Sequence, residues 1–317
     1  MFLTLGGIIF TWLLWLAIGG HLWLFLRANN RLSVIAHDPI NDDYGIYLYN
    51  IDDLQRITPL GIRPTYHKWA PDGKNIAFIY VDSISSTETH IGLINVETLE
   101  FQHLHSIESG SSYFDRMYYP TLAWSPDAKK ILFTKLITLQ PMVYQLYLLD
   151  IAAQVSEPTQ IFYGGTPKQN LVGITVSWAP GDLALTEVSY DDEFGDRHAK
   201  VFLINEDFSD DSYIVDAIQA QWVQGNESII ITLVDEHGWT LGTYRYSVDT
   251  QKTQLITHKV SQGTWTYDGG FSISHAGGIL GDFPPRIMIY NSTMNRTYEF
   301  VSHPWPASRL ISFAWAP

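Results

Sequence analysis

The sequence contains no cysteine among its 317 residues. Disulfides, thiolate zinc sites and a cysteine nucleophile are therefore excluded. Basic residues are also few: 19 Lys and Arg against 33 Asp and Glu give a formal net charge of −14. Binding to the backbone of nucleic acids needs clustered positive charge, so we expect no nucleic-acid partner. Hydrophobic residues make up 46% and charged residues only 16%, which predicts a sizeable folded core.

The motifs of common catalytic sites are missing as well. The sequence has no Gly-x-Ser-x-Gly elbow for a serine nucleophile and no Gly-rich phosphate loop ending in Lys. The glycine-rich stretch 277–281 is followed by Asp282, which would repel phosphate. We therefore predict no catalytic residue and no cofactor, and an enzyme is the less favoured class.

Metal ligands are equally sparse. His103 and His105 lie two residues apart on an expected strand, where they would point the same way, but no third ligand is identifiable nearby. The acidic stretches 41–43, 191–196 and 206–211 do not match the register of a calcium loop, which favours solvated turns. We predict no metal site.

Residues 2–26 contain no Asp, Glu, Lys or Arg. At about 1.5 Å per residue, a helix of this length crosses a hydrocarbon core of roughly 30 Å. A cleaved signal peptide needs a basic start, a shorter apolar run and a small-x-small cleavage site, and none of these fits well. We therefore predict that residues 1–31 form a transmembrane anchor, or an uncleaved signal, with a juxtamembrane segment.

The orientation of this anchor is set by conflicting signals. Arg27 and Arg31 flank its C-terminal end, and by the positive-inside rule they favour a cytoplasmic location for the rest of the chain. Large domains nevertheless translocate despite modest flanking charge. The choice therefore depends on further information from the rest of the chain.

A tryptophan-centred motif repeats along residues 32–317. Its clearest copies are Trp69-Ala-Pro71-Asp72-Gly73 and Trp124-Ser-Pro126-Asp127, and weaker copies begin at Trp178, Trp222, Trp265 and Trp315. The steps between these tryptophans are 55, 54, 44, 43 and 50 residues, a period typical of propellers. Pro, Asp and Gly suit a tight turn, and Trp can bury a large surface between neighbouring blades, so we interpret all these residues as structural.

Each repeat contains four short strand patterns, which is typical of a propeller blade. Five units are complete. The first unit lacks its leading strand, and the chain ends on an unaccompanied leading strand, residues 310–315. Pairing that strand with residues 33–35 would complete a sixth blade and leave only short strand edges exposed. We predict an all-β, six-bladed β-propeller preceded by one transmembrane helix.

The Trp-(Ala/Ser)-Pro-Asp-Gly-Lys-x-Ile-Ala-Phe pattern resembles the repeat of TolB-like β-propellers, and also that of propeller domains in prolyl oligopeptidase relatives. The resemblance covers about residues 33–317 and is strong at Trp69 and Trp124. It implies an exported bacterial protein that binds partners at the face or channel of the propeller. On this basis we favour an extracytoplasmic propeller, periplasmic or at the cell surface.

The long connections between blades are the best candidates for a recognition surface. In a propeller they emerge on the face opposite the Pro-Asp-Gly turns, and exposed aromatic residues and arginine suit recognition. The candidate binding residues are Tyr113, Phe114, Asp115, Arg116, Tyr118, Tyr119 and Trp305. We predict a membrane-anchored scaffold that binds a protein, peptide or glycan. The alternatives are an enzyme that uses the central channel, such as a lyase or hydrolase, and a sensory ectodomain.

Overall fold

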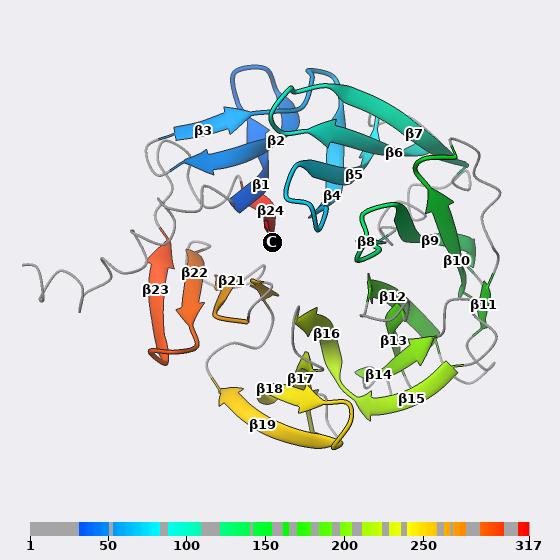
Figure 1. The fold of residues 1–317 in the computed structure, drawn as a ribbon, viewed down its shortest axis with the longest axis vertical. Coiled ribbons are helices and arrows are strands. Elements are labelled where there is room, and N and C mark those ends of the chain that lie inside the picture. The colour runs from blue at the N-terminus through cyan, green and yellow to red at the C-terminus, as the bar shows by residue number, and fades with distance from the viewer. Residues whose placement is uncertain are drawn as a thin grey trace, which may run out of the picture.

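The computed structural model describes residues 32–50, 53–82, 88–108, 121–139, 142–153, 161–164, 170–178, 184–191, 197–204, 211–223, 228–235, 240–258, 263–266, 269–276, 286–300 and 310–316. These residues form β-strands and turns arranged in a ring around a central axis (Figure 1). No helix in the described ranges is long and apolar enough to cross a membrane. The predicted anchor, residues 1–31, lies outside them.

The strands form six four-stranded sheets. In each sheet the four strands lie side by side from the centre of the ring to its outside. The sheet at the chain ends has the order β24 (Leu310–Trp315), β1 (Leu32–Asp38), β2 (Asp43–Asn50) and β3 (Asp53–Arg56). The next comprises β4 (Arg63–Trp69), β5 (Asn75–Val81), β6 (Glu88–Asn95) and β7 (Phe101–Glu108). The third comprises β8 (Leu122–Trp124), β9 (Lys130–Leu139), β10 (Met142–Asp150) and β11 (Ile161–Gly164).

The remaining three sheets follow the same plan. One comprises β12 (Asn170–Trp178), β13 (Ala184–Asp191), β14 (Arg197–Ile204) and β15 (Asp211–Asp216). Another comprises β16 (Ile218–Val223), β17 (Ser228–Val234), β18 (Thr240–Ser247) and β19 (Lys252–Thr257). The last comprises β20 (Thr264–Trp265), β21 (Phe271–Ala276), β22 (Arg286–Asn291) and β23 (Arg296–Phe300).

The predicted fold class, a six-bladed propeller preceded by a transmembrane helix, needs a correction. The described residues form an all-β propeller and contain no helix. The blades are also unequal: five sheets have an innermost strand of three or more residues, whereas β20 is reduced to two. The ring therefore has five full blades and one whose innermost strand is incomplete.

Side chains of the neighbouring blade also hydrogen-bond to the backbone around β20. The Gln219 side chain of β16 accepts a hydrogen bond from the Gly263 N–H (3.0 Å) and donates one to the Gly263 carbonyl (2.6 Å). The Gln221 side chain repeats this arrangement at the N–H and carbonyl of Trp265. Two amide side chains thus satisfy backbone groups on both sides of Thr264.

The C-terminal strand closes the ring, as predicted. β24 pairs antiparallel with β1, with Leu32 opposite Trp315 and Val34 opposite Phe313. Strands from the two ends of the described chain therefore belong to one sheet, and β24 lies near the centre in Figure 1. This pairing satisfies the edge of β1, which an open array would expose.

Period-two alternation places each blade's apolar residues on both faces. Ile76 and Phe78 of β5 are fully buried and pack against Ile35 of the chain-end sheet. Ala77 and Ile79 face the other way and pack with the third sheet around Phe133. Ile76 and Phe78 thus share one face of β5, and the hydrophobic core consists of layers between blades.

The repeated turn uses the same backbone geometry with different residues. The Gly73 N–H donates to the Ala70 carbonyl (3.0 Å), and Asp72 Oδ1 accepts from the Lys74 N–H (2.8 Å). Gly73 has a φ of 66°, in the left-handed region that favours glycine. In the second copy, Ala128 occupies this position with a φ of 59° and donates to the Ser125 carbonyl. This copy therefore holds a strained alanine.

We predict opposite effects of exchanging these two residues. Gly73→Ala should lower the free energy of unfolding by about 1 kcal/mol, because an L-residue is strained at positive φ. Ala128→Gly should raise it by up to about 1 kcal/mol, since the relief of strain exceeds the entropy cost of glycine. Urea denaturation of both variants measures the effects. Equal destabilisation by both substitutions would contradict this account of the turn.

Candidate functional site

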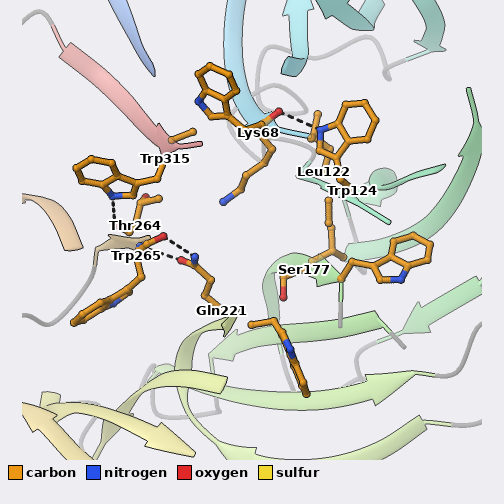
Figure 2. A pocket seen from close by; sticks show the side chains of 14 residues that line it. Lys68, Leu122, Trp124, Ser177, Gln221, Thr264, Trp265 and Trp315 are labelled. Carbon is orange, nitrogen blue, oxygen red and sulfur yellow. Dashed lines mark hydrogen bonds between the residues drawn. The ribbon is translucent and has the colours of Figure 1, made fainter. Parts of the chain in front are cut away.

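A cavity of about 90 Å³ lies between the inner strands, at the end where these strands lead into the repeated turns. Figure 2 shows its lining residues around the central axis. All six motif tryptophans contribute to it: Trp69, Trp124, Trp178, Trp222, Trp265 and Trp315. The structure thus brings together, at one end of the channel, residues that the sequence spaces about 50 positions apart.

The residue before each tryptophan also lines this cavity. These six residues, one from each inner strand, are Lys68, Ala123, Ser177, Gln221, Thr264 and Ala314. In Figure 2, Lys68 and Ser177 extend towards the space between the strands. Among the described lining residues, Lys68 is the only charged one.

Indole N–H groups connect neighbouring blades around the cavity. Trp124 Nε1 donates to the carbonyl of Lys68 (3.1 Å), and Trp315 Nε1 donates to the carbonyl of Thr264 (2.9 Å). In both cases the acceptor precedes the tryptophan of the preceding blade around the ring. Each such bond satisfies a buried indole donor and fixes the relative position of two inner strands.

At the ring closure, the Ser33 hydroxyl lies between the indole N–H and the carbonyl of the preceding blade. Trp69 Nε1 donates to Ser33 Oγ (2.8 Å), and Ser33 Oγ donates to the carbonyl of Ala314 (3.3 Å). The hydroxyl of Ser33 therefore joins three strands: β1, β4 and β24. His67 Nε2 also lies 2.8 Å from Ser33 Oγ.

The corresponding indoles on the far side of the ring lack this connection. Trp178 Nε1 and Trp222 Nε1 are buried and have no hydrogen-bond partner among the described residues. An unsatisfied buried donor has a free-energy cost, so the connection between blades is more stable at Trp69, Trp124 and Trp315 than at these two positions.

His67 is buried against the chain-end sheet, with an exposed fraction of 1%. Burial lowers the pKa of His67 from 6.5 to about 3, because the charged imidazolium would lose its hydration. His67 therefore stays neutral in the folded protein at all but very acidic pH. In the unfolded chain it takes up a proton near pH 6.5.

We predict that His67 makes the folded state sensitive to mild acid. Between pH 6.5 and 3 the unfolded state binds a proton that the folded state does not, so stability falls as the pH falls. This contribution is fully present above pH 6.5 and decreases by up to about 1.4 kcal/mol per pH unit below it.

The test is urea unfolding at pH 7.0, 6.0 and 5.0. His67→Gln should flatten the pH dependence, whatever its effect on stability at pH 7. The control Thr65→Ala, at a residue of the same strand that does not titrate in this range, should retain the wild-type slope. Unchanged slopes in the His67 variant would show that its burial does not control acid sensitivity.

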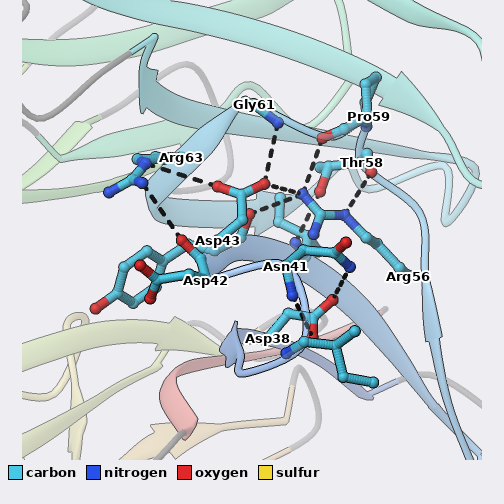
Figure 3. Close-up of polar contacts among 12 residues, drawn as sticks. Asp38, Asn41, Asp42, Asp43, Arg56, Thr58, Pro59, Gly61 and Arg63 are labelled. Atoms are coloured by element: carbon cyan, nitrogen blue, oxygen red, sulfur yellow. Dashed lines mark hydrogen bonds and ion pairs between the residues drawn. The ribbon is translucent and has the colours of Figure 1, made fainter.

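A second polar cluster lies at the other end of the blades (Figure 3). Asp43 Oδ2 accepts from Arg56 Nη2 (2.8 Å) and from the Gly61 N–H (3.0 Å), and Oδ1 lies 3.6 Å from Arg63 Nε. Burial alone would raise the pKa of Asp43, but the bonds from Gly61 and Arg56 outweigh it and lower the pKa. The cluster joins the β1–β2 turn to the connection leading into β4, which stiffens this end.

The structure does not describe any of the seven predicted binding residues. Tyr113, Phe114, Asp115, Arg116, Tyr118, Tyr119 and Trp305 lie outside the described residues. The Asp43 cluster shows that a connection of the same kind, residues 57–62, lies at the end opposite the repeated turns. Recognition by the long connections therefore stays a prediction.

The prediction that His103 and His105 point the same way is wrong. The register of β6 with β7 shifts between Ile91 and Gly92, which lie opposite His105 and His103, so a bulge separates the two histidines. His103 Nδ1 contacts the hydroxyl of Tyr80 (2.9 Å), whereas His105 packs near Phe133 of the next blade. In the described ranges, no group of three or more His, Asp or Glu could hold a metal ion.

The cavity was not predicted from the sequence, because the motif tryptophans were interpreted as structural and function was expected at the opposite face. An alignment of the six repeats on Trp would have revealed the position before it, where Lys68 and Ser177 stand out among alanine, glutamine and threonine.

Comparison with solved structures supports the fold. TolB from Acinetobacter baumannii superposes with a TM-score of 0.65 at 13% identity, over 90% of this chain and 66% of that chain. An oligogalacturonate lyase from Vibrio parahaemolyticus gives 0.55 at 13% identity, over 86% and 80%. An acylaminoacyl peptidase from Pyrococcus horikoshii gives 0.54 at 12% identity, over 86% and 44%.

At this identity the similarity shows the fold alone. The chain spans about two thirds of the length of that TolB. No protein-family model matches the sequence. No curated protein matches it either. TolB-like propellers are among the structural neighbours, and so are enzymes, so the function has to be argued from the site.

Proposed function

We propose that this chain is a non-catalytic binding propeller. It is anchored to the membrane by residues 2–26, and the propeller lies outside the cytoplasm. It presents the face with the long connections to a protein, peptide or glycan partner. The resemblance of the repeat to TolB-like propellers and the similarity in fold to TolB support this proposal.

The observation that carries the choice of binding over catalysis is the lining of the central cavity. General acid–base catalysis needs titratable groups that converge on a reacting atom. The cavity is lined instead by six tryptophans, by neutral residues and by one lysine, and no carboxylate or imidazole belongs to its described lining.

The frame that carries the long connections is suited to binding a partner. Both faces of β5 are buried against neighbouring blades, and the Asp43 cluster fixes a connection at the end opposite the turns. A rigid frame lowers the entropy cost of binding, since the surface is ordered before the partner arrives.

We predict that the full-length protein, extracted from membranes in mild detergent, co-purifies with a partner in a stoichiometric ratio. The double variant Arg116→Ala, Tyr118→Ala should reduce recovery about tenfold or more, as expected for loss of hot-spot contacts. The matched control is Tyr213→Ala, which removes an exposed aromatic residue from the outer strand of another sheet. Its recovery should equal the wild type.

Added protease tests the orientation in intact cells. Digestion of the propeller from outside supports an extracytoplasmic location, and protection until lysis would contradict it. Repeated failure to recover a partner, combined with turnover of an oligosaccharide or peptide by the purified protein, would replace the binding function with an enzymatic one.

A further inference from the structure

The cavity at the turn end of the channel has the composition of an anion site. Lys68 and Ser177 come from different blades, β4 and β12, and both extend towards the space between the inner strands (Figure 2). Lys68 carries the only charge among the described lining residues, in a protein with a net charge of −14. The charge of this described lining is thus opposite in sign to that of the whole molecule.

The ammonium group of Lys68 has no acidic partner within the described part of the chain. It lies over the ring of Tyr66, with Nζ 5.6 Å from the centroid. Lys129, which belongs to the exposed turn of the next blade, instead lies 3.5 Å from Asp127 Oδ2. A half-buried cation without a counter-charge attracts an anion more strongly than one in water.

Ser177 supplies an uncommitted hydrogen-bonding group. Its Oγ is buried and has no hydrogen-bond partner among the described residues. The other long polar side chain in the lining, Gln221, already bonds to the backbone of Trp265. Ser177 is therefore free to donate to a ligand held by Lys68, which would remove the cost of its burial.

We propose that this cavity binds a carboxylate group, with Lys68 Nζ as the charge partner, Ser177 Oγ as a hydrogen-bond donor and the indole ring as the apolar wall. A volume of about 90 Å³ accommodates a carboxylate and a few attached atoms. The carboxylate could belong to a free small molecule or to the C-terminus of a peptide that enters from the turn end. This site lies opposite the long-connection face and does not depend on the partner proposed there.

The experiment is a titration of the full-length protein in mild detergent, followed by intrinsic tryptophan fluorescence. The probes are sodium acetate, tri-alanine with a free C-terminus and tri-alanine amide, each at constant ionic strength set with chloride. The six indoles around the cavity should report occupancy. We expect acetate and free tri-alanine to bind, and the amide to bind at least about tenfold more weakly, since it lacks the charge.

The variants identify the residues involved. Lys68→Gln should weaken carboxylate binding about tenfold or more, Lys68→Arg should retain it, and Ser177→Ala should weaken it several-fold. The matched control Lys74→Gln removes an exposed lysine six residues away, in the turn that follows Trp69, and should bind as the wild type does. Thermal unfolding of each variant shows whether it is folded.

The outcomes separate the sources of the carboxylate and can overturn the site. Tighter binding of free tri-alanine than of acetate identifies a chain terminus as the ligand, and equal binding identifies a small carboxylate. No saturable response to either, or equal binding by wild type and a folded Lys68→Gln variant, would refute the site. Since no partner is needed, failure here leaves the partner recovery experiment unaffected, and the reverse also holds.

Discussion

The hydroxyl group of Ser33 joins the two ends of the described chain. It accepts from the indole of Trp69, donates to the carbonyl of Ala314, and lies within hydrogen-bond distance of His67. A propeller is stable only when its last blade meets its first, because an unclosed ring leaves strand edges and an apolar blade face in water. Hydrogen bonds of one buried hydroxyl thus connect β1, β24 and β4 at the point where the ring closes.

The site follows from the same arrangement. Closure holds the six inner strands around one axis. The indole hydrogen bonds of Trp124 and Trp315 fix neighbouring strands at the level of the residue before each tryptophan. That level is where Lys68 and Ser177 both line the cavity, although 109 positions separate them in the sequence. A motif whose role is to build blades therefore also places the lining of the cavity.

Much of the fold could be predicted because it depends on local patterns. The tryptophan period, the turn residues and the leftover terminal strand led to the repeat architecture and to the pairing of β24 with β1. The bonds from Gln219 and Gln221 to the backbone around β20 could not be predicted, because these residues come from another blade. The bulge that separates His103 from His105 is likewise a property of strand pairing rather than of either residue.

The candidate site was less accessible to sequence reasoning. A lysine before a tryptophan is unremarkable in one repeat, and it gains meaning only when six repeats converge on an axis. The isolation of the Lys68 charge depends on the lack of a charged residue before the other five tryptophans. Only the three-dimensional arrangement brings these positions together. The predicted residues of the long connections, Tyr113 to Tyr119 and Trp305, lie outside the described part and await experimental placement.

The central claim is that the Ser33 hydroxyl couples the chain ends to the next blade. Hydrogen exchange followed by mass spectrometry in wild type and Ser33→Ala tests it most directly, with peptides covering residues 32–38, 63–69 and 310–316. Loss of a buried hydrogen-bond partner costs about 1–3 kcal/mol, so all three segments should lose protection together. Loss of protection confined to residues 32–38, with β4 and β24 unchanged, would contradict the claim.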